Sequence, residues 1–274
     1  MTPAKPTAIA FIGFGEVGQR FSADLMQTGR VAISAYDLVF GDPVLAPARL
    51  AKAKDLGVVA AASAAAACET AGLVISAVTA DATETVAREA RDYLQAGQIF
   101  FDVNSAAPAT KTRAARDVEA SGAHYVEGAV MGPVLVPGIR VPILTGGPMA
   151  EAAATLLGAL GFNVTPVATE HGKASAIKLC RSIVIKGLEA LMVDCAAAST
   201  RAGVEREVYA SLAETFPSID WPKLAEYMGE RVATHGVRRS AEVQEAAAML
   251  GEMGFDASLA HAVAQAQARG ARKT

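Results

Sequence analysis

Short apolar runs alternate with segments of helical periodicity through the first 168 residues of the chain. At the start, an apolar run at residues 8–13, a helical pattern at 16–29 and a second apolar run at 31–38 follow one another. Strands that alternate with helices pair in parallel, because each helix carries the chain back across the sheet in a right-handed crossover. The alternation therefore predicts a doubly wound parallel sheet.

The alternation continues to residue 167 and then stops. We expect helices near residues 44–56, 64–71, 83–94, 111–120 and 151–160, and strands at 58–60, 73–78, 98–103, 125–130, 141–144 and 162–167. Beyond residue 169 the Ala-rich sequence indicates only helices, separated by glycines and prolines. The chain is thus expected to fold as an α/β domain over residues 1–168 followed by an all-α domain over residues 169–274.

A glycine-rich turn lies between the first predicted strand and the first predicted helix. Its sequence, Gly13-Phe14-Gly15-Glu16-Val17-Gly18, fits the pattern Gly-x-Gly-x-x-Gly. In this context the first glycine permits a tight turn, the second lets the backbone approach a pyrophosphate, and the third allows the helix to pack closely on the strand. The helix N-terminus adds partial positive charge. The six residues predict a dinucleotide site in a Rossmann-type domain.

Asp37 ends the second predicted strand, where a carboxylate accepts hydrogen bonds from the adenosine ribose and repels a 2′-phosphate. No Arg or Lys lies in residues 38–45 to hold such a phosphate. The sequence therefore favours NAD as cofactor, with NADP as the alternative. Glu16 is expected to point toward the nicotinamide half or toward solvent, because a carboxylate beside a pyrophosphate is repelled. A plain turn with Asp37 capping a loop is the structural alternative.

Composition narrows the classes of partner. The 274 residues are 52% hydrophobic and 19% charged, which supplies ample apolar side chain for a core. A formal charge of −3 is far from the basic profile of a nucleic-acid binder. We expect no signal peptide and no membrane span, and three cysteines without metal-ligand spacing indicate a reducing cytoplasm and no metal. Small molecules are the expected partners.

Residues 172–195 read as one long helix whose apolar residues cover more than a narrow stripe, so we expect it to be largely buried, with Cys180 and Cys195 as small buried hydrophobes. Polar residues recur along one face at steps of three or four, and they are His171, Ser175, Lys178, Ser182, Lys186 and Glu189. Such a stripe lines a cavity, forms an ion-pair seam or faces solvent. We assign Lys186 and Glu189 to a solvated face, and Lys178 to an interdomain cleft where desolvation favours its neutral form.

Four motifs follow one another in the first 190 residues: the glycine turn, Ile75-Ser76-Ala77-Val78-Thr79, Asp102-Val103-Asn104-Ser105-Ala106-Ala107-Pro108, and the helix around Lys178. Together they resemble the β-hydroxyacid dehydrogenases, which include 3-hydroxyisobutyrate dehydrogenase and are related to 6-phosphogluconate dehydrogenase. The resemblance implies that Lys178 is the general acid/base and that Val78, Thr79, Asn104 and Ser105 lie at the cofactor or substrate. Ser105 and Pro108 also fit an ordinary helix start.

Two segments depart from that family's pattern. Where the family has Asp-Ala-Pro-Val-Ser-Gly-Gly, this chain has Glu127-Gly128-Ala129-Val130-Met131-Gly132-Pro133, and Arg181 and Ser182 replace a pair of asparagines. We expect Met131, Gly132, Arg181 and Ser182 to contact a substrate that is not the family's usual one. Near His235 and Glu242, an anion contact from Arg238 or Arg239 is expected, with a weak surface ion pair as the alternative.

The sequence therefore predicts an NAD(P)-dependent dehydrogenase that acts on a CH–OH group and transfers hydride between the nicotinamide and a small β-hydroxyacid, or its semialdehyde or keto form. Two alternatives stay open. An imine or aldehyde reductase on the same scaffold is favoured if the pocket around Met131 is apolar, and a non-catalytic nucleotide-binding protein would keep only the glycine turn. Decarboxylation after oxidation is left open. The Ala-rich long helix predicts a homodimer.

Overall fold

The computed structural model describes residues 7–271. The chain divides into two compact units, Met1–Lys178 and Leu179–Thr274. The boundary that the sequence suggests after residue 168 coincides with the end of the last strand, whereas the structural division falls inside the helix that follows. Each unit is described by itself below.

The first unit contains one eight-stranded sheet with strand order β3-β2-β1-β4-β5-β6-β7-β8. The strands are β1 Thr7–Ile12, β2 Val31–Tyr36, β3 Val59–Ala60, β4 Leu73–Ser76, β5 Ile99–Asp102, β6 His124–Val130, β7 Ile143–Gly146 and β8 Val164–Ala168. From β1 the order runs outward in both directions, which is the doubly wound, Rossmann-type arrangement. The expected α/β fold is confirmed, and its topological switch point lies between β1 and β4.

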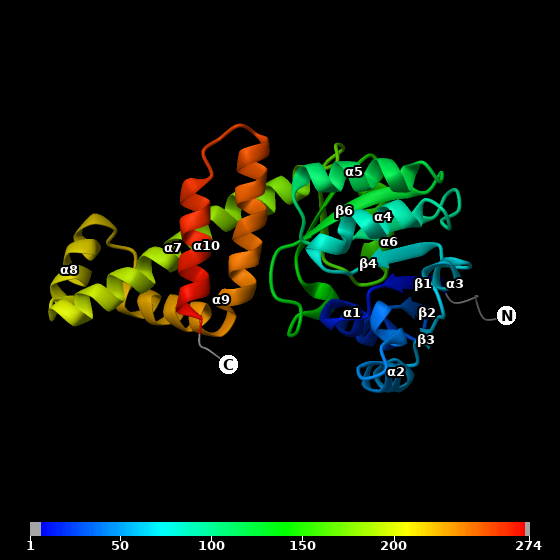
Figure 1. Ribbon diagram of the computed structural model, residues 1–274, viewed down its shortest axis with the longest axis horizontal. Coiled ribbons are helices and arrows are strands. Elements are labelled where there is room, and N and C mark those ends of the chain that lie inside the picture. The colour runs from blue at the N-terminus through cyan, green and yellow to red at the C-terminus, as the bar shows by residue number, and fades with distance from the viewer. Residues whose placement is uncertain (1–6, 272–274) are drawn as a thin grey trace. The chain divides into compact units, whose positions relative to one another are not determined.

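Helices cover both faces of this sheet (Figure 1). One face carries α1 Glu16–Met26, α2 Ala46–Asp55 and α6 Ala150–Ala159, and the other carries α3 Ala64–Cys68, α4 Thr83–Ala90 and α5 Pro108–Glu119. Three short turns of 3-10 helix, η1 Leu38–Gly41, η2 Ala80–Ala82 and η3 Gly138–Arg140, lie in the connections.

The central strands β1, β4, β5 and β6 are buried on both faces of the sheet, which explains why they read as continuous apolar runs. Successive residues of β1 enter opposite cores: Ile9 and Phe11 pack on the α1 side, while Ala10 and Ile12 pack on the α5 side. Each large apolar side chain buried in this way stabilises the fold by about 1.5–3 kcal/mol. This packing on both sides fixes the positions of the strands relative to one another.

One strand runs against the predicted direction. β7 pairs antiparallel with β6, so the expectation of parallel pairing is wrong there. The connection over residues 131–142 contains only the short η3 and no crossover helix, and an antiparallel neighbour needs none. The reversal places Gly146 of β7 directly beside Glu127 of β6.

The second unit is all-helical, as predicted. It contains most of α7 Lys173–Ala202, together with α8 Glu205–Thr215, α9 Trp221–Glu252 and α10 Ser258–Gly270. Gly236 of α9 lies against the backbone of α10, where a Cβ would collide with the carbonyl oxygen of Gln267. The absence of a side chain at Gly236 therefore lets the two helices pack closely.

The long helix α7 leaves an apolar face uncovered. Val184 and Leu191 are 60% and 68% exposed, and Ile177 and Leu188 are also exposed. Cys180 lies exposed among them. The expectations that this helix is largely buried, and that Cys180 is a buried hydrophobe, are wrong, because helical periodicity identifies an apolar face without identifying what covers it.

Candidate active site

The glycine turn has the backbone geometry that its sequence predicts. Gly13 has φ +92°, and a Cβ there would lie 2.7 Å from the carbonyl carbon of Ala77, in the loop after β4. A Cβ on Gly18 would collide with the carbonyl oxygen of Gly13, whereas one on Gly15 would meet nothing within 4 Å. The turn is thus closely packed at Gly13 and Gly18 and open at Gly15. It presents the first amides of α1 at the switch point of the sheet.

The side chains of this turn mostly face away from that open side. The ring of Phe14 is fully buried against Phe40, with centroids 6.0 Å apart, and Val17 packs against the same core. Glu16 is exposed. A pyrophosphate at this turn would therefore meet backbone amides rather than side chains, which is what a glycine-rich cradle requires.

Asp37 is joined directly to the glycine turn. Its Oδ2 accepts a 2.6 Å hydrogen bond from the backbone N–H of Phe14, and its Oδ1 accepts one of 2.8 Å from the N–H of Val39. A carboxylate has about four acceptor sites, so each oxygen keeps a lone pair for a further donor. This geometry fits the hydroxyls of a ribose.

A cation near this turn was missed by the sequence reasoning. Arg49 of α2 donates from Nη1 to the carbonyl oxygen of Phe14 at 2.7 Å. Together with Glu16, Arg20 and Lys52 it lines a cavity of about 720 Å³ between α1 and α2. Residues 38–45 contain no Arg or Lys, and Arg49 reaches back to the turn from the helix that follows them.

Asn104 connects the loops that follow β4 and β5. Its Oδ1 accepts from the Val78 N–H at 2.6 Å, and its Nδ2 donates to Ser76 Oγ at 3.0 Å. The neighbouring Ser105 Oγ is buried and has no hydrogen-bond partner among residues 7–271. A buried hydroxyl without a partner calls for an explanation, and a bound amide or carboxylate would supply one. Thr79 is exposed beside this loop.

Behind Asn104 lies a buried ion pair that the sequence reasoning also missed. Lys111, fully buried on α5, places Nζ 2.8 Å from Asp102 Oδ1, and Tyr125 Oη donates to Asp102 Oδ2 at 2.5 Å. Burial, and then the Asp102 charge, raises the pKa of Tyr125 well above its usual value. The same Asp102 Oδ1 accepts from the Asn104 N–H at 2.9 Å. The only sequence signal was Lys111 itself, which lies on the buried side of α5 with Ala114, Ala115 and Val118.

Lys178 is half-buried on the polar face of α7, between the buried serines Ser175 and Ser182. Ser182 Oγ accepts from Lys186 Nζ at 3.0 Å, while Arg181 is exposed. The remaining predicted substrate residues, Met131 and Gly132, are half-buried just beyond the end of β6. Lys178, Met131 and Gly132 belong to the first unit, and Arg181 and Ser182 to the second.

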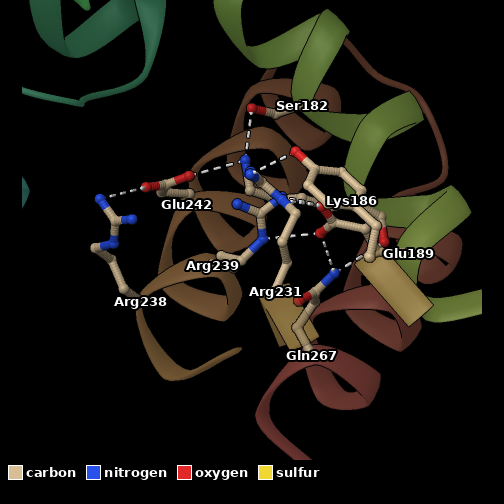
Figure 2. Close-up of polar contacts among 9 residues, drawn as sticks. Ser182, Lys186, Glu189, Arg231, Arg238, Arg239, Glu242 and Gln267 are labelled. Carbon is tan, nitrogen blue, oxygen red and sulfur yellow. Dashed lines mark hydrogen bonds and ion pairs between the residues drawn. The ribbon is translucent and has the colours of Figure 1, made fainter. Parts of the chain in front are cut away.

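Glu189 and Lys186 form the centre of an ion-pair seam within the second unit (Figure 2). Glu189 accepts hydrogen bonds from Arg239 Nε at 2.8 Å, Arg231 Nε at 3.1 Å and Gln267 Nε2 at 3.0 Å. Lys186 Nζ lies 2.8 Å from Glu242 Oε2. The ion-pair seam is therefore the correct interpretation, and the solvated face assigned to Lys186 and Glu189 is wrong.

Arg239 is buried in this seam, where Glu189 binds its guanidinium through both Nε and Nη2. Its neighbour Arg238 is 53% exposed and lies 3.9 Å from Glu242. Of the two arginines, only Arg238 keeps its donors accessible.

Over residues 7–271, no group of three or more His, Cys, Asp or Glu side chains is arranged to hold a metal ion. Within the same range, no helix combines the length and apolar character needed to cross a bilayer.

Two family descriptions match the chain. Residues 8–167 match the NAD-binding domain of 6-phosphogluconate dehydrogenase, and residues 197–270 match a domain of unknown function. A conserved hypothetical protein from Sinorhizobium meliloti 1021 is 38% identical, covers 97% of this chain and 88% of its own, and superimposes with a TM-score of 0.85.

More distant structures share the fold. 3-Hydroxyisobutyrate dehydrogenase from Mycobacterium tuberculosis, solved with L-serine, is 17% identical with a TM-score of 0.79 over 96% of this chain and 93% of its own. An imine reductase from Streptomyces aurantiacus is 19% identical with a TM-score of 0.62 over 96% of this chain and 94% of its own. At these identities the likeness concerns the scaffold, which serves both kinds of protein.

Proposed function

The chain belongs to the family of the NAD-binding domain of 6-phosphogluconate dehydrogenase, and from this membership we propose that it is an oxidoreductase that transfers hydride between a nicotinamide cofactor and a small β-hydroxyacid, or its semialdehyde or keto form. The observation that carries the proposal is the glycine turn at the switch point, open above Gly15 and joined to Asp37 by the Phe14 amide. The bound nicotinamide supplies the hydride acceptor or donor.

The residues of the first unit fit such a cofactor. The amides at the start of α1, from Gly15 to Val17, would hold the pyrophosphate, and the free lone pairs of Asp37 would hold the adenosine ribose. The unpartnered Ser105 hydroxyl, fixed beside Asn104, would donate to the nicotinamide amide or to the substrate. Val78 and Thr79 would line the same loop. NAD is the proposed cofactor, because Asp37 repels a 2′-phosphate.

Lys178 is proposed as the proton-transfer group. During oxidation it would accept the proton of the substrate hydroxyl, and during reduction it would return it. The backbone of Gly132, with Arg181 or Ser182, would orient the acid group of the substrate, and Met131 would also contact the substrate. Arg239 is not proposed as a substrate contact, because Glu189 already binds its guanidinium.

A second candidate is an NADPH-dependent imine or aldehyde reductase. Arg49 and Lys52 beside the glycine turn favour a cofactor with an extra phosphate, and the Met131 thioether favours an apolar substrate over a carboxylate. This candidate uses the same glycine turn and the same Lys178. It differs in the cofactor and in the polarity of the substrate.

We also propose that the protein is a homodimer, since the apolar face of α7 at Val184, Leu188 and Leu191 is uncovered within the chain. Light scattering at micromolar concentration should then give twice the chain mass, and Leu191→Glu should shift it toward the monomer. A monomeric wild-type mass would contradict the proposal.

The deciding experiment is a fluorescence titration with NADH and, separately, NADPH, followed by turnover assays with β-hydroxyacids and with cyclic imines. NADH binding with hydroxyacid turnover supports the first candidate. NADPH binding with imine reduction supports the second, and binding without any turnover would leave only nucleotide binding.

A further inference from the structure

Glu127 is a fully buried carboxylate in the middle of β6. A buried carboxylate is retained only where donors satisfy it, because an unpaired charge in the protein interior is strongly destabilising. The donors to Glu127 therefore show which part of the chain it holds.

Both oxygens of Glu127 hold the first turn of α7. Oε1 accepts from the Ala174 N–H at 2.7 Å, and Oε2 accepts from Ser175 Oγ at 3.0 Å. The residue before the helix, Gly172, has no side chain with which to cap it. The sheet therefore supplies the cap, and the negative charge lies where the partial positive charge of the helix N-terminus favours it.

The strand on the other side of Glu127 is shaped to leave room for this contact. Gly146 of β7 is the register partner of Glu127, and a Cβ at Gly146 would lie 3.1 Å from Glu127 Cγ and closer still to Oε1. Any larger residue at position 146 would displace the carboxylate of Glu127. The antiparallel pairing of β7 with β6 thus places a glycine beside Glu127. It thereby contributes to the geometry of the anchor, by which we mean the contact of Glu127 with Ala174 and Ser175.

The anchor lies beside the loop that contains Asn104. Asp102 of β5 is the register partner of Glu127 on its other side, and Asp102 holds the N–H of Asn104. Lys178 lies one turn beyond Ala174, on the same face of α7. Asp102 and Glu127, which are paired on neighbouring strands, therefore hold the Asn104 loop and the helix of Lys178, respectively.

We propose that Glu127 is a positioning residue, which fixes Lys178 relative to the Asn104 loop by holding the first turn of α7. This inference rests on the proposed role of Lys178. It does not involve the glycine turn, which lies at the end of β1. Loss of the anchor should therefore reduce the chemical step while cofactor binding persists.

Two variants of matched length separate anchoring from packing. Glu127→Met keeps the volume and removes both acceptors, whereas Glu127→Gln keeps one acceptor for Ala174 and can donate to Ser175 Oγ. We expect Glu127→Met to lower kcat on the order of 10- to 100-fold, as a misplaced catalytic group does. Glu127→Gln should recover most of that loss, and the Kd for NADH should change less than about twofold in both variants.

A third variant disturbs the anchor without replacing Glu127 itself. Gly146→Ala pushes on the Glu127 carboxylate and should lower kcat in the same direction, again with NADH binding unchanged. Gly158→Ala in α6, where a Cβ meets nothing within 4 Å, is the matched control and should retain wild-type kcat. This pair keeps the proposal testable if Glu127→Met does not fold.

Hydrogen exchange provides a measurement that needs no substrate. The amides of residues 174–176 should exchange at least tenfold faster in Glu127→Met or Gly146→Ala than in Glu127→Gln or Gly158→Ala. If the wild-type protein turns over no substrate, the proposed function fails and this measurement still tests the anchor. Equal exchange and equal kcat in the Met and Gln variants would overturn the inference, as would a loss of NADH binding in proportion to kcat.

Discussion

The backbone N–H of Phe14, in the glycine turn, donates a 2.6 Å hydrogen bond to the carboxylate of Asp37 at the end of the second strand. The turn expected to hold the pyrophosphate and the carboxylate expected to hold the ribose are therefore joined within the protein itself. Asp37 has a structural role in shaping the turn in addition to its proposed role toward the ligand.

Asp37→Ala should weaken NADH binding by about 10- to 100-fold, because a charged acceptor is lost and the Phe14 amide loses its partner. Asp37→Asn, which retains one acceptor oxygen, should lose less. A fluorescence titration of both variants with NADH and NADPH measures the effect. If Asp37→Ala binds NADH as tightly as the wild type, the carboxylate does not contact the ribose.

Lys178→Ala should reduce turnover by about 10²- to 10⁴-fold, the usual contribution of a positioned proton donor or acceptor, while NADH binding stays unchanged. Steady-state kinetics with the best substrate, together with the NADH titration, separates the two effects. Lys173→Ala, an exposed lysine one turn earlier on α7, is the control. Full turnover by Lys178→Ala would refute the proposed mechanism.

Lys111→Ala should destabilise the protein by about 3–5 kcal/mol, because it leaves Asp102 buried without its compensating charge. Urea unfolding monitored by circular dichroism gives the free energy of unfolding. Glu84→Ala breaks a half-exposed ion pair with Arg113 in the same unit and should cost less than about 1 kcal/mol. Similar costs for the two variants would show that the buried pair has no special weight.

The seam in the second unit predicts a pH-dependent stability. Burial lowers the pKa of Lys186 from its usual 10.5, although the charge of Glu242 opposes this shift. A lysine whose pKa is lower in the folded state binds its proton less tightly there, so its charged form destabilises the fold. This penalty is fully present below the folded pKa of Lys186 and disappears as the pH rises from that pKa to 10.5.

The double variant Lys186→Met/Glu242→Met, which removes both members of this ion pair, should therefore be at least as stable as the wild type at pH 7, since replacing a buried ion pair by apolar side chains of similar volume is often neutral or stabilising. The difference should shrink as the pH approaches 10.5. Thermal unfolding of both proteins from pH 6 to pH 10 tests this expectation. A variant that is less stable at pH 7 by an amount independent of pH would contradict it.

The sequence predicted the centre of the sheet well because its strands are buried on both faces there. Runs such as residues 73–75 are apolar throughout, and the glycine turn needs specific backbone freedom at Gly13, so both features are visible locally. The antiparallel β7 was not predicted, because strand direction depends on the absence of a crossover helix rather than on the residues of the strand itself.

The polar residues were harder to interpret. Periodicity correctly grouped Ser182, Lys186 and Glu189 on one face of α7, but the ionic partners of Lys186 and Glu189 lie on other helices, 42 or more positions away in the case of Glu189. For the same reason, Lys111 and Glu127 were not recognised as buried. A sequence pattern shows which side chains share a face, and only tertiary packing decides what they meet.

The position of Arg49 has a practical consequence for protein engineering. Cofactor preference in this fold depends on the residues near the end of the second strand, where an acidic side chain holds the ribose hydroxyls or an Arg holds a 2′-phosphate. In this chain an exchange of residues 38–45 would leave the guanidinium of Arg49 at the Phe14 carbonyl, supplied by the following helix. A clean change of preference therefore requires residues 37–52 to be transplanted as one block.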